Sequence, residues 1–251
     1  MKEIIVQKLF ELEQSENIKI LFACESGSRA WGFASPDSDF DVRFIYARPL
    51  NDYLSIADGP DTVGLPVDEV LDISGWDIKK TLKLFLKSNG PLYEWLQSPI
   101  IYHQNPFFAD ELRGLMPNYF SLRSGANHYL SMAYNTLRDD LQGEMVKMKR
   151  YFYALRPALA CLWIIERGSV PPMEFESLRT LITDSAVQHS IDDLMKQKLV
   201  ADEKALIAKI SLLNDWLTTT LSLCKEQVPL LPAINQKTNE LNEVFRKYIW
   251  A

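Results

Sequence analysis

The sequence contains 251 residues with a formal net charge of -6, and 47% of its residues are hydrophobic. This apolar content is sufficient for a packed core, so we expect a folded protein of one large or two small domains. The negative charge argues against non-specific binding of long nucleic acid, which depends on a basic surface that neutralises phosphates. Any polyanion must therefore meet a local basic patch.

The sequence also predicts the cellular location of the protein. It contains no run of about 18 apolar residues, and residues 1–16 are charged and helix-patterned rather than typical of a secretory signal. Cys24, Cys161 and Cys224 lie far apart in apolar surroundings, which predicts reduced core thiols rather than disulfides or a zinc site. We therefore expect a cytoplasmic protein without a membrane partner.

The N-terminal part of the chain alternates between helical and strand patterns. Residues 2–14 have the apolar spacing of a helix, and residues 18–23 form an apolar run typical of a buried strand. Residues 25–39 are rich in Ser, Gly, Asp and Pro, which predicts a loop with one helical turn. Strand composition returns at residues 40–46 and again at residues 67–73.

Beyond this point the periodicity becomes helical. Ser74 and the glycine after it predict the exit from the third strand, a helix begins at Trp76, and no strong strand is predicted afterwards. One long stripe has helical spacing and requires partner helices: Leu206, Ile210, Leu213, Leu217 and Leu221. We therefore predict an α+β protein, with a small sheet and flanking helices over residues 1–104 and an α-helical bundle over residues 105–251.

The loop after the first strand contains Gly27, Ser28 and Arg29. A strand that runs into Gly-Ser and a helical turn exposes unpaired backbone N–H groups, which attract phosphate oxygens. Gly27 permits a close backbone approach, Ser28 adds a hydroxyl donor, and Arg29 supplies positive charge. Gly-Ser turns are common, however, so an ordinary turn is the better interpretation of this segment alone.

Two aspartates, Asp39 and Asp41, open the second predicted strand. Residues i and i+2 of a strand project from the same face, so we expect the two carboxylates side by side. Neighbouring negative charges repel, which makes such a pair costly without a cation. Magnesium prefers oxygen ligands and keeps positions open for substrate phosphates. For an isolated Asp-x-Asp, a solvated acidic turn is the favoured alternative.

Together, the Gly-Ser turn and the Asp-x-Asp strand resemble the signature of the DNA polymerase beta-like nucleotidyltransferase superfamily. In that superfamily the Gly-Ser holds the triphosphate, the two aspartates bind metal ions, and a third carboxylate lies on a later strand of the sheet. Further motifs narrow the resemblance to the nucleotidyltransferases associated with RNA repair or RNA ligase, over roughly residues 20–165. These motifs lie at residues 27–32, 35–44, 75–80, 88–99 and 149–157.

The resemblance implies an enzyme that depends on Mg²⁺ or Mn²⁺. It would move a nucleoside monophosphate from an NTP such as ATP to an acceptor hydroxyl and release pyrophosphate. Asp39, Asp41 and Asp72 are the implied metal ligands and catalytic residues, and Asp72 would help to accept the proton of the acceptor hydroxyl. Asp68 and Asp77 stay open as alternatives for the third carboxylate. For Asp77, stabilisation of a helix N-terminus explains the residue equally well.

The resemblance also indicates which residues contact the substrates. The candidates are Gly27, Ser28, Arg29, Lys149, Arg150 and Arg156. The last three fall near the start of a predicted helix, where a solvated basic face is the alternative interpretation. Tyr93 and Trp95 offer ring faces to a base, although packing is the favoured interpretation for both. An RNA 3' end, a protein side chain and a small hydroxylated molecule all stay open as the acceptor, and the family's association with RNA repair favours RNA.

Two other functions are compatible with parts of this pattern. A catalytically silent nucleotide-binding module would keep the pocket, for regulation or interaction, and transfer nothing. A phosphatase of the haloacid dehalogenase type would use Asp39 as its nucleophile, since Asp39 to Val42 fit the Asp-x-Asp-x-Val pattern. In those phosphatases the aspartates close an apolar strand, whereas here they open one, and this argues against a phosphatase.

Overall fold

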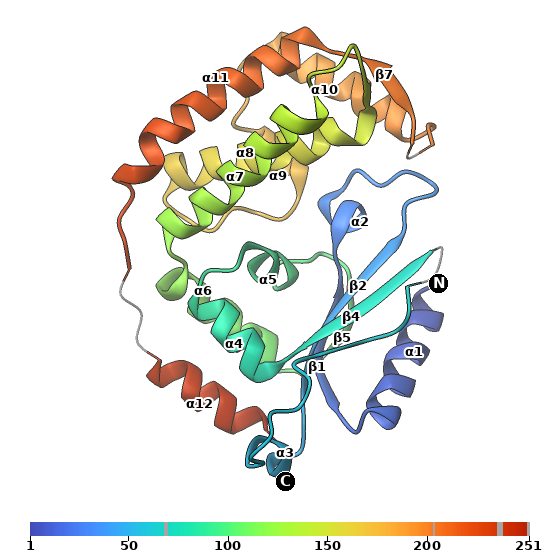
Figure 1. Ribbon diagram of the computed structural model, residues 1–251, viewed down its shortest axis with the longest axis vertical. Helices are drawn as coiled ribbons and strands as arrows, with labels where there is room; N and C mark the ends of the chain where they lie inside the picture. Colours follow the sequence, from blue (N-terminus) through green and yellow to red (C-terminus); the bar gives the residue numbers. More distant parts are fainter. Residues whose placement is uncertain (68–69, 203, 235–237, 250–251) are drawn as a thin grey trace. The chain divides into compact units, whose positions relative to one another are not determined.

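The computed structural model describes residues 1–67, 70–202, 204–234 and 238–249 (Figure 1). The chain folds into two compact units whose segments interleave along the sequence. The first unit contains Met1–Ala30, Asp39–Tyr119 and the C-terminal segment, and the second contains Trp31–Ser38 and Phe120–Ile234. The predicted boundary between residues 104 and 105 falls inside the first unit.

The first unit is built on a mixed β-sheet, which agrees with the predicted α+β class. Within the described residues the sheet has five strands in the order β3-β4-β2-β1-β5. β2 and β4 are parallel, whereas the other neighbouring pairs are antiparallel. The strands are β1 (Lys19–Glu25), β2 (Phe40–Ala47), β3 (Thr62–Gly64), β4 (Leu71–Asp77) and β5 (Ile101–Gln104).

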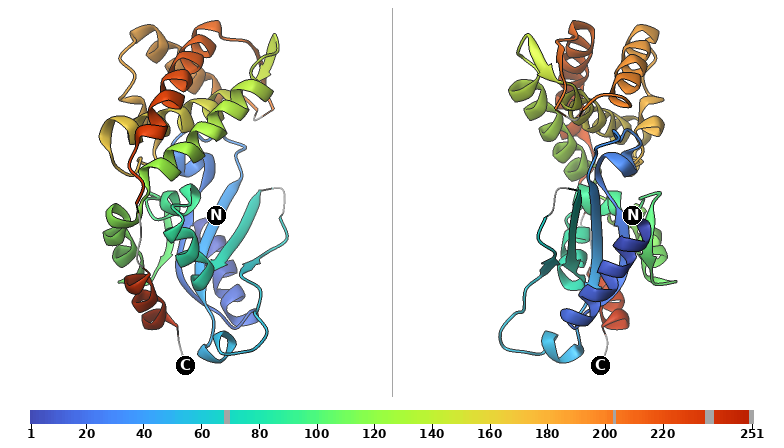
Figure 2. Two further views of the ribbon diagram at one scale, coloured as in Figure 1. Left: turned by 60° about the vertical axis from the view of Figure 1, so that its left-hand side comes forward. Right: turned by 90° about the vertical axis from the view of Figure 1, so that its right-hand side faces the viewer.

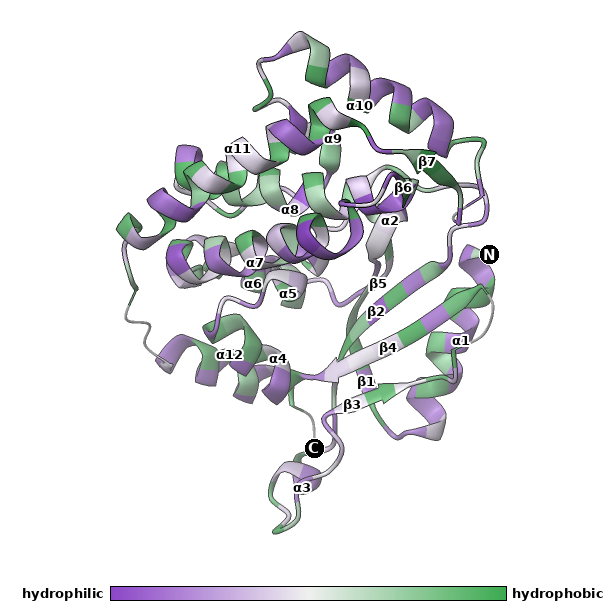
Figure 3. Ribbon diagram, turned by 45° about the horizontal axis from the view of Figure 1, so that its top comes forward, coloured by the Kyte–Doolittle hydropathy of each residue, from purple (hydrophilic) through white to green (hydrophobic). Residues whose placement is uncertain are grey.

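Helices cover both faces of this sheet. α1 lies on one side and α4 on the other, as the views of Figures 1 and 2 agree. Hydrophobic and hydrophilic residues alternate along α1 (Figure 3). Its apolar stripe, Ile5, Leu9 and Leu12, is buried as the sequence predicts. The helices of this unit are α1 (Lys2–Ser15), α3 (Leu50–Tyr53), α4 (Ile78–Leu86), α5 (Gly90–Trp95), α6 (Phe108–Tyr119) and α12 (Asn239–Tyr248).

The alternation of side chains along β2 decides which residues face α1. Val42, Phe44 and Tyr46 are buried in one apolar cluster with the stripe of α1. Because successive side chains of a strand point to opposite faces, Asp41 and Arg43 project from the other side of the sheet. The core on one face therefore fixes where the polar residues of the other face stand.

A close contact between β2 and β4 leads to a prediction about stability. A Cβ atom on Gly75 would lie 2.3 Å from the ring of Phe44, which is fully buried. We expect Gly75→Ala to lower the free energy of unfolding by about 1–3 kcal/mol, because the core must shift to accept the methyl group. Urea denaturation measures the change.

Gly114→Ala in α6 is the matched control for this substitution. Its added Cβ would meet nothing within 4 Å, and alanine is favoured over glycine inside a helix by about 0.8–1 kcal/mol. We therefore expect Gly114→Ala to leave stability unchanged or to raise it. Equal stability losses in the two variants would contradict the steric explanation for Gly75.

The third predicted strand is shifted along the sequence. Residues 67–73 are expected to form it, with an exit at Ser74, but β4 begins at Leu71 and continues to Asp77. Val67 and Val70 are exposed instead of buried. Ser74 stays in the strand because it pairs with β2 on one side and with β3 on the other. The helix expected from Trp76 therefore begins two residues later, at Ile78.

β5 was not expected either, because no strand is predicted after Ser74. It pairs with β1 at the edge of the sheet, with Phe22 opposite Gln104 and Ala23 opposite His103. An edge strand of four residues in which only His103 is exposed carries little of the hydrophobic alternation that predicts a strand.

The second unit is mainly helical, as predicted for the C-terminal half. The long stripe is interrupted, however: Leu206 lies in a short strand, β7, which pairs with β6, and the helix starts only at Ser211. The elements are α7 (Leu122–Asp140), β6 (Met145–Lys147), α8 (Met148–Arg167), α9 (Phe175–Arg179), α10 (Ser185–Lys198), β7 (Leu206–Ala208), α11 (Ser211–Gln227) and the 3₁₀ helix η1 (Val228–Leu230).

Two further expectations can be compared with this fold. The three cysteines are free and buried, as the sequence predicts. Among the described residues, no helix combines the length and the apolar character that a membrane crossing requires.

Residues 31–38, which lie between the Gly-Ser turn and the Asp-x-Asp strand, belong to the second unit. Phe33 stacks on Phe152 of α8 with ring centroids 4.7 Å apart, and it meets Phe175 edge-on at 5.6 Å. Trp31 ends the short helix α2 (Gly27–Trp31), and the guanidinium of Arg156 lies 4.6 Å from its ring centroid. Residues 31–38 are therefore anchored by aromatic packing in the second unit, whereas the Gly27 turn before them and Asp39 and Asp41 after them belong to the first unit.

Candidate active site

The glycine turn after β1 lies directly against Asp41. Gly27 adopts φ +60°, a conformation that glycine accepts without strain. A Cβ atom at Gly27 would lie only 2.1 Å from Oδ2 of Asp41, and the backbone N–H of Ser26 donates to the Asp41 carbonyl at 2.8 Å. A side chain here would require a strained backbone and a displaced Asp41 carboxylate, so the predicted phosphate-binding turn and one predicted metal ligand lie against each other.

Asp41 and Asp72 are neighbours across the parallel pair β2–β4. They are direct partners in the strand register, and each is the second residue of its strand. Nη2 of Arg43 bridges their carboxylates, at 3.2 Å from Oδ1 of Asp41 and 2.7 Å from Oδ2 of Asp72. The sheet therefore brings two carboxylates within reach of one cationic nitrogen, although Asp72 lies early in its strand rather than late as expected.

Asp39 precedes β2 and is exposed. Its backbone carbonyl accepts a hydrogen bond from Nε of Arg29 at 3.1 Å, and the guanidinium of Arg29 lies 3.7 Å from the ring centroid of Phe40. Arg29 thus spans from the glycine turn to the start of β2. Ser28 follows Gly27 in α2 and is buried, so the expected substrate-binding residues of this loop stand at one end of the sheet.

The carboxylates can be tested for their fit to a divalent cation. No group of three or more His, Cys, Asp or Glu side chains that could hold a metal ion occurs in the part of the chain that the structure describes. Asp41 and Asp72 nevertheless share one positive group, and paired carboxylate oxygens are ligands that Mg²⁺ and Mn²⁺ prefer. The pair fits such a cation, and Asp39 stays a predicted further ligand.

Glu25 supports this site, a role that no pattern in the sequence predicts. Its side chain is fully buried; Oε1 accepts the backbone N–H of Asp41 at 2.7 Å, and Oε2 accepts the hydroxyl of Tyr102 at 2.5 Å. Burial raises the pKa of the Glu25 carboxyl above its usual value. Tyr102 of β5 thus donates to Glu25 of β1, and Glu25 in turn accepts the backbone N–H of Asp41 and fixes its position.

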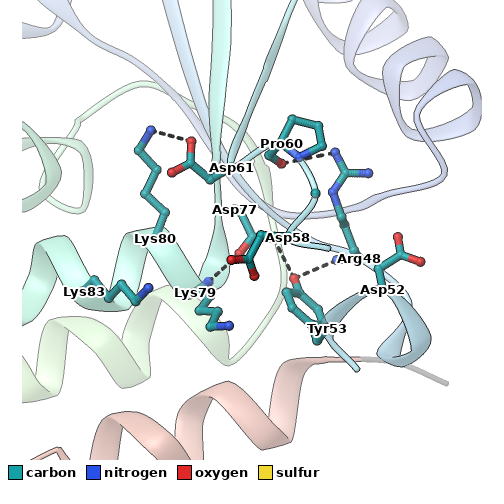
Figure 4. Close-up of a pocket in the computed structure, with 11 residues that line it drawn as sticks. Arg48, Asp52, Tyr53, Asp58, Pro60, Asp61, Asp77, Lys79, Lys80 and Lys83 are labelled. Carbon is teal, nitrogen blue, oxygen red and sulfur yellow. Dashed lines mark hydrogen bonds and ion pairs between the residues drawn. The ribbon is translucent and has the colours of Figure 1, made fainter. Parts of the chain in front are cut away.

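Asp77, an alternative for the third carboxylate, lies at the opposite end of β4 from Asp72. The two residues are five positions apart along the strand, which corresponds to about 16 Å. Its Oδ1 accepts the N–H of Lys79 at 2.7 Å and caps α4, while Oδ2 accepts the hydroxyl of Tyr53 at 2.6 Å. Asp77 lines a cavity of about 220 Å³ together with Arg48 and lysines of α4 (Figure 4). These contacts favour the helix-stabilising interpretation, and Asp68 lies outside the described residues.

The burial of Asp77 predicts a pH dependence of stability. Burial raises the pKa of its carboxyl above the usual 3.8, so the folded protein holds this proton more tightly than the unfolded chain does. The stability that this proton confers is fully present below the pKa of Asp77 in the unfolded chain. It is lost as the pH rises through the higher pKa of Asp77 in the folded protein. Relative to Asp77→Asn, the free energy of unfolding of the wild type should fall across that window and then level off.

Urea denaturation of both proteins between about pH 4 and pH 8 measures this difference. Asparagine also accepts hydrogen bonds at helix N-termini, so the variant keeps the cap. Its amide nitrogen cannot accept the Tyr53 hydroxyl, but this loss does not vary with pH over the range measured, so the pH-dependent part of the difference reports the titration. A difference that grows in favour of the wild type as the pH rises would contradict the prediction.

The basic residues expected to contact substrate from the C-terminal half lie on α8, in the second unit. Arg156 is buried there, and its Nε and Nη2 donate to the carbonyl of Met173 at 3.1 and 3.0 Å. Arg150 forms an ion pair with Asp140 at 3.4 Å, and Lys149 is partly buried. Arg156 therefore makes hydrogen bonds that stabilise its own unit. The contacts of Lys149, Arg150 and Arg156 with substrate stay predictions.

The aromatic residues near Asn89 have structural roles, as favoured from the sequence. Asn89 caps α5 by accepting the N–H of Leu92 at 3.2 Å. Tyr93 is buried and donates its hydroxyl to the carbonyl of Phe85 at 3.1 Å. Trp95 packs against Trp76, with ring centroids 4.0 Å apart.

A glycine turn at the end of β1 thus lies against Asp41, which pairs with Asp72 on the next strand, and this is the arrangement that the resemblance to polymerase beta-like nucleotidyltransferases predicts. A family model described as "RNA repair pathway DNA polymerase beta family" (RlaP) matches residues 1–247. The chain therefore belongs to the RlaP family of nucleotidyltransferases.

Relatives and similar structures were found as well. The chain is 42% identical to the uncharacterized protein YcgL of Bacillus subtilis (strain 168) over 246 residues, which cover 97% of this chain and 95% of YcgL. The structure of spectinomycin adenyltransferase AAD(9) from Enterococcus faecialis, with ATP and spectinomycin, aligns with 89% of this chain and 98% of its own at 11% identity and a TM-score of 0.44. A nucleotidyltransferase-like protein from Exiguobacterium sibiricum 255-15 aligns with 97% of this chain and 79% of its own at 9% identity and a TM-score of 0.33.

Proposed function

We propose that this protein is a metal-dependent nucleotidyltransferase that moves a nucleoside monophosphate from an NTP to an acceptor hydroxyl on RNA and releases pyrophosphate. One observation carries the proposal. Asp41 and Asp72 are register partners on parallel strands, and Gly27 approaches Asp41 so closely that no side chain would fit between them. Phosphates bound at the glycine turn would thus lie beside the carboxylates.

The glycine turn would bind the triphosphate. Backbone N–H groups at Gly27 and Ser28 can donate to phosphate oxygens, and the Ser28 hydroxyl adds a further donor. Arg29, whose Nε holds the carbonyl of Asp39, would place positive charge at the same end of the sheet. Fixed donors of this kind stabilise the charge that develops on the transferred phosphoryl group.

The acidic residues would hold the metal ions and prepare the acceptor. A bound Mg²⁺ or Mn²⁺ supplies Lewis-acid stabilisation of the phosphates and of the departing pyrophosphate. Asp41 and Asp72, with Asp39 as a further ligand, would bind it through carboxylate oxygens. Asp72 would also orient the acceptor hydroxyl and accept its proton.

RNA is proposed as the acceptor because the family is described by an RNA repair pathway. Lys149, Arg150 and Arg156 are the proposed contacts to phosphates or to the acceptor. With a net charge of -6, we expect binding to a short RNA end rather than to long RNA, and this binding should weaken as salt is added.

The test combines the protein with each labelled NTP, Mg²⁺ or Mn²⁺, and a panel of RNA ends, small hydroxylated molecules and the protein itself. Pyrophosphate release and the mass of each acceptor are measured. The expected result is a nucleotidyl adduct on RNA together with pyrophosphate. An adduct on a different acceptor would overturn only the RNA assignment.

The silent nucleotide-binding module is the second candidate, and one observation favours it: Arg43 already supplies a positive group to both carboxylates. Metal-dependent NTP binding by calorimetry, without pyrophosphate release on any acceptor, would support the module over the enzyme.

A further inference from the structure

The cavity beside Asp77 takes no part in the proposed reaction. It has a volume of about 220 Å³ and is lined by residues of α3, of the segment that follows α3 and of α4 (Figure 4). Pockets that enclose a whole drug-sized ligand usually measure about 300–1,000 Å³, whereas one water molecule takes about 30 Å³. The volume therefore suits a small polar group rather than a whole nucleotide.

Cationic side chains line two sides of this cavity. Arg48 stands directly after β2, whereas Lys79 and Lys83 lie one turn apart on α4 (Figure 4). None of these three side chains forms an ion pair with a carboxylate in the described ranges of the chain. Lys80 differs, because it pairs with Asp61 at 2.9 Å. Three positive groups at the cavity are therefore not directly neutralised by these residues.

The hydrogen bonds from the Arg48 guanidinium to backbone carbonyls are long. Its Nη1 and Nη2 donate to the carbonyls of Glu16 and Pro60, both at 3.4 Å, beyond the usual range of such bonds. Its Nε is buried and has no acceptor among the described residues, so the guanidinium depends on acceptors at its two outer nitrogens. An anionic oxygen in the cavity would form a shorter, charge-assisted bond there.

Four carboxylates also line the cavity, but two of them are already engaged. Asp77 caps α4 and accepts the hydroxyl of Tyr53, and Asp61 is taken up by its ion pair with α4. The other two, Asp52 and Asp58, are exposed. Three cationic groups thus stand against two exposed carboxylates, which favours an anionic ligand over a cation.

We propose that this cavity binds a phosphoryl anion through Arg48, Lys79 and Lys83. A phosphate group carries up to about two negative charges and three strong acceptor oxygens, which suits cations on two sides of a small cavity. Arginine binds such oxygens through its fixed fork, and lysine adds a mobile point charge. Free phosphate, free pyrophosphate and a phosphate group of an RNA strand share this chemistry. Asp77, which lines the cavity, lies about 16 Å along β4 from Asp72, so this site is separate from the glycine turn.

Calorimetry of the full chain with pyrophosphate, at low salt and without divalent cations, measures the binding. We expect Arg48→Gln to weaken it by about tenfold or more, as loss of a charge-assisted hydrogen bond does. Lys83 is exposed, so Lys83→Gln should weaken binding by about two- to fivefold and leave the fold intact. Asp58→Asn removes a negative charge and should tighten binding. Thermal melting establishes that each variant is folded.

Lys87→Gln is the matched control for Lys83→Gln. Lys87 is the exposed lysine one turn further along the same helix, at its C-terminal cap and outside the cavity lining, so its loss should leave the affinity unchanged. Equal weakening in the two lysine variants would mean that only net charge matters, and would overturn the site. Binding that is lost in Gly27→Ala and kept in Arg48→Gln would place the anion at the glycine turn and overturn it as well.

The source of the phosphate is distinguished by titrating inorganic phosphate, pyrophosphate and a short single-stranded RNA in parallel. Tighter binding of the RNA, weakened in Arg48→Gln, assigns the cavity to an RNA phosphate. Binding of phosphate or pyrophosphate that is weakened in Arg48→Gln, with RNA binding unaffected, assigns it to the free anion. No binding of any of the three by the wild type, or equal binding by the wild type and folded Arg48→Gln, would overturn the site. None of these results requires nucleotidyl transfer, so a wild type that transfers nothing would leave the cavity's role standing.

Discussion

Asp41→Asn is expected to abolish nucleotidyl transfer while the fold persists. The substitution removes a carboxylate that faces Asp72 across β2–β4 and that touches the glycine turn. Metal ligation supplies several kcal/mol of transition-state stabilisation, and a loss of about 4 kcal/mol corresponds to roughly a thousandfold in rate. Asp39→Asn and Asp72→Asn should show losses of the same kind. Labelled NTP turnover with the cognate acceptor measures them.

Asp77→Asn is the matched control for these substitutions. It makes the same chemical change on β4, but at the end of the strand where Asp77 caps α4, so turnover should stay near that of the wild type. Unchanged turnover in Asp41→Asn would remove the enzymatic interpretation. Loss of turnover in Asp77→Asn, with stability unchanged, would return Asp77 to the catalytic candidates.

Gly27→Ala is expected to cause the second largest loss. The added Cβ would overlap Oδ2 of Asp41 at 2.1 Å, so either the turn or the carboxylate must move. A displacement of about 1 Å at a reacting centre can cost about a hundredfold in rate. We therefore expect about a hundredfold lower transfer and weaker Mn²⁺ binding. The same turnover assay measures the transfer, and the electron paramagnetic resonance signal of free Mn²⁺ measures the binding.

Backbone strain contributes to this variant as well, and Gly168→Ala isolates that contribution. Gly168 has φ +59°, against +60° for Gly27, but a Cβ there would meet nothing within 4 Å. Both variants should lose about 1–2 kcal/mol of stability from the left-handed backbone, and only Gly27→Ala should lose transfer. Equal transfer rates in Gly27→Ala and Gly168→Ala would show that the glycine turn takes no part in the reaction.

Much of the first unit follows from local patterns. The stripe of α1, the buried strand β1 and the alternation along β2 each depend on residues close in sequence, so the sequence predicts them and places Asp41 at the start of a strand. The contact between Asp41 and Asp72 depends on strand pairing across a long connection, which no local pattern encodes. The same holds for β4, whose extension past Ser74 is fixed by the strands on its two sides.

The residues missed at the site were missed for a related reason. Glu25 looks like the polar end of a strand in the sequence, and its role becomes visible only when the N–H of Asp41 and the hydroxyl of Tyr102 reach its two oxygens. Arg43 stands in a motif that was recognised, but its bond to Asp72 requires the parallel register. Arg43 does offer a signal in the sequence, since it is a polar residue two positions after Asp41 on the same strand, whereas Glu25 is 16 positions from Asp41 and offers none.

The anchoring of residues 31–38 bears on how this protein can be divided. A fragment ending at residue 104 would contain Gly27, Asp41 and Asp72, yet it would leave Phe33 without Phe152 and Phe175, against which it packs in the whole chain. The exposed ring of Phe33 would then lie in the segment that joins the Gly27 turn to β2. We therefore expect that a shortened protein containing the sheet would also need α8 and α9 to keep residues 31–38 packed.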